Sequence, residues 1–318
     1  MEKKEVFIVS AVRTPLGSFG GVFANISATE LGAIAIKGAL EKGNVNSRDI
    51  DEVFMGNVCS ANLGQAPARQ AALSAGISNS TPCSTVNKVC SSGAKSIMLG
   101  AQSIQLGQAD IIVAGGMENM SAVPYYVPKG RFGYKYGNAE LIDGLHKDGL
   151  FDPYDQISMG VFADQTASKY EISRQSQDDF AIRSYKNAAS ATKNGIFAKE
   201  IVSVSIPQRR GEPIVVLEDE EFKKVKFEKV SLLSAAFTKK GTVTAANAST
   251  INDGASALIL ASAEAVKKYR LNPIAKILSY ADSAQEPKWF TTAPTKAAPK
   301  ALKLAKTPTA SHLPGYNP

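Results

Sequence analysis

A short apolar run at residues 110–116, Asp-Ile-Ile-Val-Ala-Gly-Gly, is the feature that most limits what this chain can fold into. A strand that is apolar at almost every position must be buried on both faces, and such strands are typical of parallel sheets covered by helices. Further short apolar runs alternate with helical patterns along the first part of the chain. The predicted strands lie at 6–12, 52–55 and 84–87, and the predicted helices at 28–42, 66–75 and about 90–106. This alternation predicts an α/β fold with right-handed crossovers.

The pattern is interrupted after residue 116. Residues 124–149 are rich in Gly, Pro, Tyr and Lys and predict long loops, and polar helices follow at 162–171 and 174–194. The strand and helix alternation then returns, with strands at 255–262 and 275–281 and helices at 263–269 and 297–305. We therefore expect a first α/β domain at 1–118 with 249–270, a loop domain at 119–248, an incomplete second α/β domain at 271–306, and an unrelated tail at 307–318.

Composition excludes several classes of function. The 36 Lys and Arg against 29 Asp and Glu give a net charge of +7 in 318 residues, which is too modest to indicate nucleic-acid binding. No apolar run is long enough to cross a bilayer, and the first residues resemble neither a signal peptide nor a transit peptide, so we expect a cytoplasmic location. Three cysteines are too few for a disulfide framework, and the two histidines, His146 and His312, form no metal-ligand pattern.

One cysteine stands where a nucleophile is expected. Cys90 follows a predicted strand directly and opens a predicted helix, in Ser84-Thr-Val-Asn-Lys-Val-Cys90-Ser-Ser-Gly. The positive end of a helix dipole favours a thiolate, and unpaired backbone N–H groups there can face a thioester oxyanion. On position alone, a buried structural cysteine remains the alternative. Cys59 and Cys83 are most simply packing residues.

Five motifs resemble those of one family and stand in its order. They are Val9-Ser-Ala-Val-Arg-Thr-Pro-Leu-Gly, Gly64-Gln-Ala-Pro-Ala-Arg-Gln, Val86-Asn-Lys-Val-Cys90-Ser-Ser-Gly, Ala114-Gly-Gly-Met-Glu-Asn-Met-Ser and Gly241-Thr-Val-Thr-Ala-Ala-Asn-Ala-Ser. Over roughly residues 4–305 the chain resembles the thiolases, in particular the acetyl-CoA acetyltransferases. The resemblance implies a fold of repeated βαβαβ units with an inserted loop domain. It also implies Claisen condensation of two acetyl-CoA molecules to acetoacetyl-CoA, and the reverse reaction, through an acyl group on Cys90.

The same resemblance implies a binding site for coenzyme A, as substrate and product, with no tightly bound cofactor. The residues that it assigns to this site are Leu150, Ser158, Met159, Tyr185, Lys224, Val225, Lys226, Lys229, Phe237, Ala245, Ser249 and Phe290. The basic residues match the stretch that meets the phosphates, although such a run is by itself more often a solvated helix face. Phe290 matches a position in the acyl pocket.

Two further features carry over from the family. Tyr185 and the carbonyls of Ala245, Ala246 and Ala248 match a potassium site, although a ring packed on its helix is the simpler interpretation of Tyr185. The loop at 130–137 resembles a tetramerisation loop, so we expect the complete protein to be a homotetramer.

The sequence also departs from the family. Ser158 stands where the family often has histidine, so a hydrogen-bonding group is kept but its reach and basicity are lost. The family's Asn-Glu-Ala-Phe, Gly-His-Pro and Cys-x-Gly motifs are missing from these 318 residues, and His312 is not a substitute for their histidine. We therefore expect a truncated chain that is impaired in condensation. A non-catalytic CoA-binding or subunit-interacting isoform is the alternative, and a frameshift after Lys306 is a third.

Overall fold

A computed structural model describes residues 3–307, so His312 and, except for Thr307, the tail predicted at 307–318 lie outside the described residues. The chain divides into two units. The first contains the residues up to Leu150 together with Ile182–Glu228 and Ser249–Lys276. The second contains Phe151–Ala181, Lys229–Ala248 and the residues from Ile277 onward.

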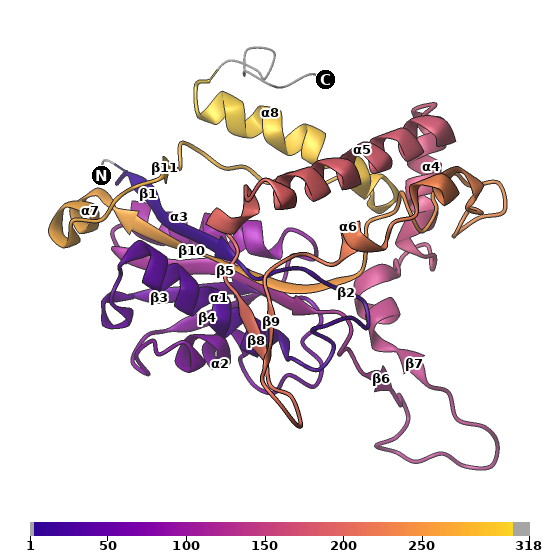
Figure 1. Cartoon of the computed structure of the whole chain (residues 1–318), viewed down its shortest axis with the longest axis horizontal. Coiled ribbons are helices and arrows are strands. Elements are labelled where there is room, and N and C mark those ends of the chain that lie inside the picture. Colours follow the sequence, from indigo (N-terminus) through magenta and orange to yellow (C-terminus); the bar gives the residue numbers. More distant parts are fainter. Residues whose placement is uncertain (1–2, 308–318) are drawn as a thin grey trace. The chain divides into compact units, whose positions relative to one another are not determined.

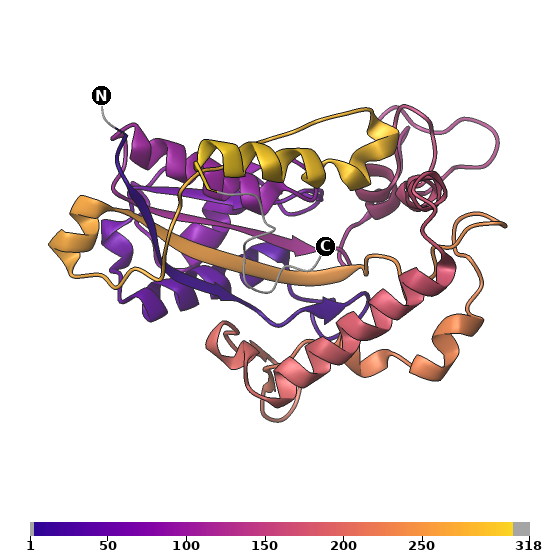
Figure 2. The same cartoon turned by 90° about the horizontal axis from the view of Figure 1, so that it is seen from above.

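The first unit is built on one mixed sheet of seven strands. Its strands are β1 (Val6–Arg13), β2 (Gly17–Ser18), β3 (Glu52–Gly56), β4 (Cys83–Val86), β5 (Ile111–Asn119), β10 (Asn252–Ser262) and β11 (Ala275–Lys276). The order across the sheet is β11-β1-β10-β5-β3-β4, and β2 pairs with β10. Strand β3 runs parallel to both β4 and β5, whereas β10 lies antiparallel between β1 and β5 (Figure 2). The predicted α/β class is confirmed, with one long antiparallel strand in its centre.

Helices cover both faces of this sheet (Figure 1). They are α1 (Ala28–Gly43), α2 (Pro67–Ser74) and α3 (Ser92–Gln105), and α7 (Ala263–Tyr269) follows β10. Side chains alternate along a strand, and β5 shows the consequence. Ile111 and Val113 belong to the core beneath α1 and α2, while Ile112 lies against Gly100 of α3 on the other face. The continuous apolar run that the sequence shows is therefore buried on both sides, as predicted.

Helix α1 has clear sequence signals at both of its ends. The hydroxyl of Ser27 accepts the backbone N–H of Glu30, while the Glu30 carboxylate accepts the N–H of Ser27 at 2.8 Å, which completes a capping box. Asn44 ends the helix in the left-handed conformation, which asparagine tolerates. These caps explain why the predicted bounds of α1 agree with the structure to within one residue.

A two-stranded ribbon within the first unit carries a long loop. Strands β6 (Tyr125–Tyr126) and β7 (Ile142–Asp143) pair antiparallel at its base, and one π-helical turn, η2 (His146–Leu150), follows. The loop between them bears the exposed residues Phe132 and Tyr136. This segment confirms the long loops predicted at 124–149.

Two more segments complete the first unit. The hairpin of β8 (Val204–Ile206) and β9 (Ile214–Val216) was not predicted, and α6 (Glu221–Lys224) follows it, while η1 (Ser47–Asp49) and η3 (Phe197–Lys199) are short 3₁₀ turns. An ion-pair network fixes the start of α6. The Arg13 guanidinium donates to Asp219 at 2.7 Å and to Glu200 at 2.7 Å, and the N–H of Leu16 also donates to Asp219 at 2.8 Å.

The second unit is mostly helical. Its elements are α4 (Met159–Lys169), the first part of α5 (Arg174–Lys193), η5 (Pro287–Thr292) and α8 (Pro294–Leu304), and η4 (Phe227–Leu232) leads into it. Buried Asp178 accepts Arg174 at 2.7 Å and the side chain of Asn247 at 2.9 Å, which ties α5 to the segment before residue 249. A buried charge needs such partners.

The structure corrects several predicted boundaries. Helix α4 begins at Met159 and not at residue 162, and strand β10 begins at Asn252 and not at residue 255. The strand expected at 275–281 contains only Ala275–Lys276, because the residues after it form no ladder in the described part of the chain. Helix α8 begins at Pro294 and not at residue 297, since proline is well suited to the first turn of a helix. Helix α3 begins at Ser92, two residues after Cys90. No helix among residues 3–307 is long and apolar enough to cross a membrane.

Candidate active site

Cys90 lies in the turn that joins β4 to α3 in the first unit. Strands β3 and β4 run parallel and both end at this edge of the sheet, where ligands bind in open α/β folds. The prediction that Cys90 opens the helix is wrong by two residues, since Ser91 is the N-cap and its side chain makes no capping hydrogen bond. The Cys90 thiol is nevertheless exposed, whereas Cys59 is buried and Cys83 is half-buried. A buried structural role for Cys90 is thereby excluded.

The backbone of this turn adopts an unusual conformation. Val89, immediately before Cys90, has a φ of +47°, in the left-handed region that β-branched residues avoid. Hydrogen bonds bracket the turn. The Ser92 hydroxyl accepts the N–H of Lys88 at 2.8 Å and donates to the carbonyl of Val89 at 2.6 Å, and the side-chain oxygen of Asn87 accepts the N–H of Val89 at 3.0 Å.

The start of α3 packs directly on the backbone of the sheet. A Cβ atom on Gly56, at the end of β3, would come within 2.6 Å of the carbonyl carbon of Ser92. A Cβ atom on Gly116 of β5 would lie 3.4 Å from the Cα of Gly93. Glycine at position 56 therefore allows the helix to begin close to the strand ends, with Cys90 just before it.

The half-buried carboxylate of Glu118 organises the neighbouring loop. Glu118 accepts the N–H of Val58 at 2.8 Å, the N–H of Cys59 at 3.3 Å and the side-chain amide of Asn57 at 3.0 Å. Burial raises the pKa of Glu118, and these donors partly offset that effect. Burial also raises the pKa of the Cys59 thiol to about 12, and the nearby Glu118 adds to the shift. Cys59 is therefore held in the unreactive thiol form.

In the second unit, α4 brings several candidate residues together. Ser158 is the N-cap of this helix, Met159 is its first residue, and the ring of Phe237 lies against Gly160 so closely that a Cβ atom there would clash with it. Phe290 packs edge-on against buried Phe162, with ring centroids 6.4 Å apart. The Thr291 and Thr166 hydroxyls are hydrogen-bonded at 2.8 Å, and the Lys169 ammonium lies 3.9 Å from the centre of the Trp289 ring. Consecutive residues 289–291 thus contact one face of α4.

The remaining candidates are divided between the two units. Cys90, Leu150, Tyr185, Lys224, Val225, Lys226 and Ser249 belong to the first unit, and Lys229, Ala245, Ala246 and Ala248 belong to the second. Lys224 forms an ion pair with Glu220 at 3.8 Å, and Lys223 forms one with Glu218 at 2.6 Å. The pair of Lys223 and Glu218 is exposed on both sides, and such pairs are weak, whereas the carboxylate of Glu220 is largely buried. Burial raises the pKa of the Tyr185 hydroxyl, which therefore keeps its proton at neutral pH.

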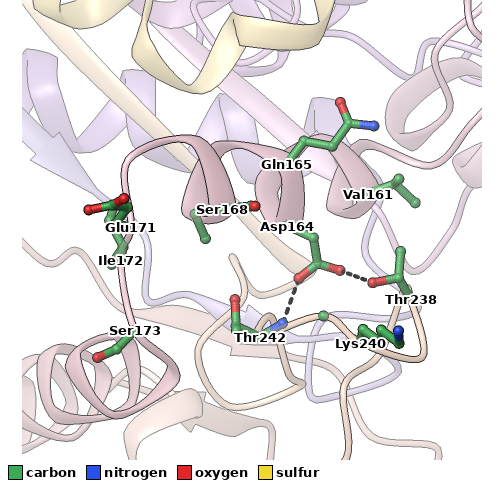
Figure 3. A pocket seen from close by; sticks show the side chains of 12 residues that line it. Val161, Asp164, Gln165, Ser168, Glu171, Ile172, Ser173, Thr238, Lys240 and Thr242 are labelled. Carbon is green, nitrogen blue, oxygen red and sulfur yellow. Dashed lines mark hydrogen bonds between the residues drawn. The ribbon is translucent and has the colours of Figure 1, made fainter.

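A cavity of about 490 Å³ opens in the second unit beside α4, with residues 171–173 and 238–242 completing its wall. Figure 3 shows Asp164 pointing from α4 toward Thr238 and Thr242. Its carboxylate accepts the Thr238 hydroxyl at 2.9 Å and the N–H of Thr242 at 2.8 Å. No residue that the sequence nominates lines this cavity. Asp164 is occupied in shaping the loop, so the cavity offers no evident reactive group.

Some features of the site were missed by sequence reasoning. Ser92 and Asn87 hold the turn, and Glu118 anchors the neighbouring loop. Nothing in the local sequence distinguishes these three residues from ordinary polar residues. Gly56 did carry such a signal, because a single glycine beside a strand pattern indicates a close backbone approach. Among residues 3–307, no group of three or more His, Cys, Asp and Glu side chains is arranged to hold a metal ion.

The chain is similar to known proteins over most of its length. Residues 6–264 match the family model described as Thiolase, N-terminal domain. The chain is 58% identical over 306 residues to "Acetyl-CoA acetyltransferase" of Schizosaccharomyces pombe, covering 96% of this chain and 78% of the relative. It is 49% identical to "Acetyl-CoA acetyltransferase ERG10, cytosolic" of Gibberella zeae, covering 94% of this chain and 76% of that protein, while other relatives of similar identity are named mitochondrial. Among solved structures, the Acat5 thiolase of Ascaris suum in complex with coenzyme A superposes with a TM-score of 0.92 at 46% identity, covering 97% of this chain and 79% of that one.

Proposed function

Since the chain belongs to the thiolase family, we propose that it is an acetyl-CoA C-acetyltransferase in which Cys90 carries the acetyl group. The observation that carries this proposal is the exposed Cys90 thiol, held between the ends of parallel strands and the start of α3. The other two thiols are buried or half-buried. Only Cys90 is open to a substrate as large as a CoA thioester.

The first half of the reaction follows from this placement. The Cys90 sulfur attacks the carbonyl carbon of acetyl-CoA, the bond from that carbon to the CoA sulfur breaks, and the proton of the Cys90 thiol ends on the released CoA thiol. In the second half, the α-carbon of another acetyl-CoA loses a proton and attacks the acyl carbon. The bond from that carbon to the Cys90 sulfur breaks as acetoacetyl-CoA forms, and the Cys90 thiolate takes up a proton in place of the one released. Thiolysis is the same sequence in reverse.

The residues that the family resemblance assigns to coenzyme A are proposed to share its binding according to their chemistry. Lys224, Lys226 and Lys229 supply cations for its phosphates. Leu150, Met159 and Phe237 supply apolar contacts for its pantetheine arm. The Ser158 hydroxyl, which makes no capping bond, is available to that arm, and Phe290 lines the acyl pocket. The remaining contacts are assigned to Tyr185, Val225, Ala245 and Ser249.

Potassium is a further part of the proposal. The Tyr185 hydroxyl and the carbonyls of Ala245, Ala246 and Ala248 form an all-oxygen set, which suits a hard cation. Stimulation of activity by K⁺, and its loss in Tyr185→Phe, would support the site. Equal activity with and without K⁺ would count against it.

A cytoplasmic location is also proposed, with relatives carrying both cytosolic and mitochondrial names. Imaging of the native protein in its own cells tests this directly, and staining confined to mitochondria would refute it.

An exchange experiment tests the proposed function. Incubating the protein with acetyl-CoA and labelled free CoA is expected to move the label into acetyl-CoA, because the acetyl group passes to Cys90 and back. Cys90→Ser is expected to abolish the exchange, and Cys83→Ser is the matched control that keeps it. Saturable binding of CoA with no exchange would instead favour the alternative of a non-catalytic CoA-binding protein.

A further inference from the structure

We propose that Asn87 and Ser92 are positioning residues for the nucleophile. Their side chains hold the turn before α3 in the unfavourable backbone conformation that places Cys90. The inference rests on the proposed function, because it concerns the residue that the function makes the acetyl carrier. It adds two residues whose contribution is geometric, since neither is assigned a contact with substrate.

The first observation is the backbone strain. Val89 adopts φ +47° although it is β-branched and its side chain is 53% exposed. Valine avoids the left-handed region because its Cβ atom approaches the following carbonyl oxygen. Burial of the Val89 side chain does not supply the compensation, since half of it faces solvent. The contacts that maintain this conformation must therefore be hydrogen bonds to its backbone.

Ser92 supplies two of these bonds from one hydroxyl. It accepts the N–H of Lys88 at 2.8 Å and donates to the carbonyl of Val89 at 2.6 Å. The backbone N–H of Ser92 also donates to the carbonyl of Val89, at 3.0 Å. Ser92 is only 4% exposed, so these bonds are shielded from water. The hydroxyl closes a ring around the turn that contains Cys90.

Asn87 holds the turn from the other side. Its side-chain oxygen accepts the N–H of Val89 at 3.0 Å, which fixes the peptide that enters the strained residue. Its side-chain nitrogen lies 3.5 Å from the carbonyl of Val58, in the loop that half-buried Glu118 anchors through the N–H of Val58. The turn is thus connected to a rigid point at the end of β3.

These bonds constrain the direction of Cys90 more than they stabilise the core. Both side chains bond to the backbone of the turn or of the adjoining loop, and the turn itself is largely exposed. If either side chain is removed, Val89 is expected to relax to a negative φ, which changes the direction in which the Cys90 side chain points. Acyl transfer requires the sulfur to meet the thioester carbon within a narrow range of position, and an error of about 1 Å can cost on the order of 100-fold.

The test compares two reactions of the same thiol in the full 318-residue protein. Acetylation of Cys90 by acetyl-CoA needs the correct geometry, whereas alkylation by iodoacetamide needs only an exposed thiol. For Ser92→Ala we expect acetylation to slow by about 10-fold or more, while alkylation of Cys90 stays within about 3-fold. Both rates are followed at the Cys90 peptide by mass spectrometry.

Ser96→Ala is the matched control. Ser96 is a fully buried serine of the same helix, and its hydroxyl donates to the carbonyl of Ser92 at 3.0 Å without contacting the turn. It is expected to keep the parent rate of acetylation. Asn87→Ala removes an exposed side chain and is expected to slow acetylation as Ser92→Ala does, so the test stays decisive if Ser92→Ala does not fold.

A rescue experiment addresses the strain itself. Glycine adopts a positive φ at little cost, so Val89→Gly is expected to restore part of the acetylation rate in the Ser92→Ala background. Three results would overturn the inference: parent-like acetylation in both Ser92→Ala and Asn87→Ala, an equal loss in Ser96→Ala, or no rescue by Val89→Gly. A parent protein that is alkylated but never acetylated would overturn the proposed function itself, and this inference with it.

Discussion

The three cysteines lie in different surroundings, and these decide which of them reacts. Burial raises the pKa of Cys59 to about 12 and also raises the pKa of half-buried Cys83, whereas the side chain of Cys90 faces solvent. Because the thiolate is the reactive form, iodoacetamide at mildly alkaline pH is expected to label Cys90 first, Cys83 more slowly and Cys59 only after unfolding. Peptide mapping over time checks this order. If Cys59 were labelled as fast as Cys90 in folded protein, Cys59 would not be buried as described.

The carboxylate of Asp110 makes the stability of the fold depend on pH. Asp110 accepts the Ser262 hydroxyl at 2.8 Å and the Lys4 ammonium at 3.2 Å, and these contacts lower its pKa below the ordinary 3.8. A lowered folded pKa contributes stability above the unfolded pKa, and that stability is lost as pH falls through the folded value. Asp110→Asn should therefore be less stable than the parent near neutral pH, with the difference shrinking below about pH 4. Urea unfolding at several pH values measures it, and a difference independent of pH would refute the linkage.

At this scale the sequence predicted the identity of the nucleophile but not its geometry. A strand followed by Cys90 and small residues is a local signal for a nucleophile. The surrounding motifs indicate the family to which that nucleophile belongs. The left-handed conformation of Val89 has no such signal, because valine normally excludes it. Ser92 and Asn87 are recognisable only once their distances to the turn are known.

Among the elements, the contact between β3 and α3 depends on one glycine. A Cβ atom at position 56 would lie 2.6 Å from the backbone of Ser92, so Gly56→Ala must push the helix start away and is expected to cost about 1–3 kcal/mol of stability. Gly93→Ala is the matched control, since the nearest atom to its added Cβ lies 3.8 Å away. Thermal or urea unfolding distinguishes the two. Equal losses would mean that the close approach at Gly56 is not what limits this position.

Elements with strong local signals were predicted best. Helix α7 has the predicted bounds, and α1 and α5 differ from theirs by one residue, because caps and periodicity mark their ends. Strand β11 was predicted too long, since an apolar segment forms a strand only where a neighbour pairs with it. The hairpin of β8 and β9 was missed because its strands have three residues each, too few for alternation to be read.

For the whole molecule, the loop between β6 and β7 presents aromatic side chains to solvent. Phe132 is 89% exposed, and Tyr136 is fully exposed. Exposed aromatic side chains gathered on one segment are typical of interaction surfaces, which supports the tetramer predicted from this loop. Replacing both with serine is expected to lower the molar mass measured by light scattering without changing the circular dichroism. A complete protein that is monomeric at all concentrations would contradict the prediction.

The 318 residues also predict an imbalance between the two halves of the reaction. Cys90 is the last of their three cysteines, and the predicted acid/base partners from the family's further motifs do not occur in them. Positioned acid/base groups contribute about 10²–10⁴-fold each, so a protein of these residues should form acetoacetyl-CoA at least about 100-fold more slowly than the fission yeast relative. Comparable rates of condensation would show that other side chains take over this role. The predicted domain boundaries stay a prediction.

The central claim is that Cys90 accepts an acetyl group from acetyl-CoA. The most direct measurement is to quench the protein after brief exposure to acetyl-CoA and to locate the acetyl group by peptide mass spectrometry. The account predicts one acetyl group on the Cys90 peptide, removable by hydroxylamine as a thioester and absent from Cys90→Ser. An unmodified Cys90 peptide, or an acetyl group that persists in Cys90→Ser, would contradict it.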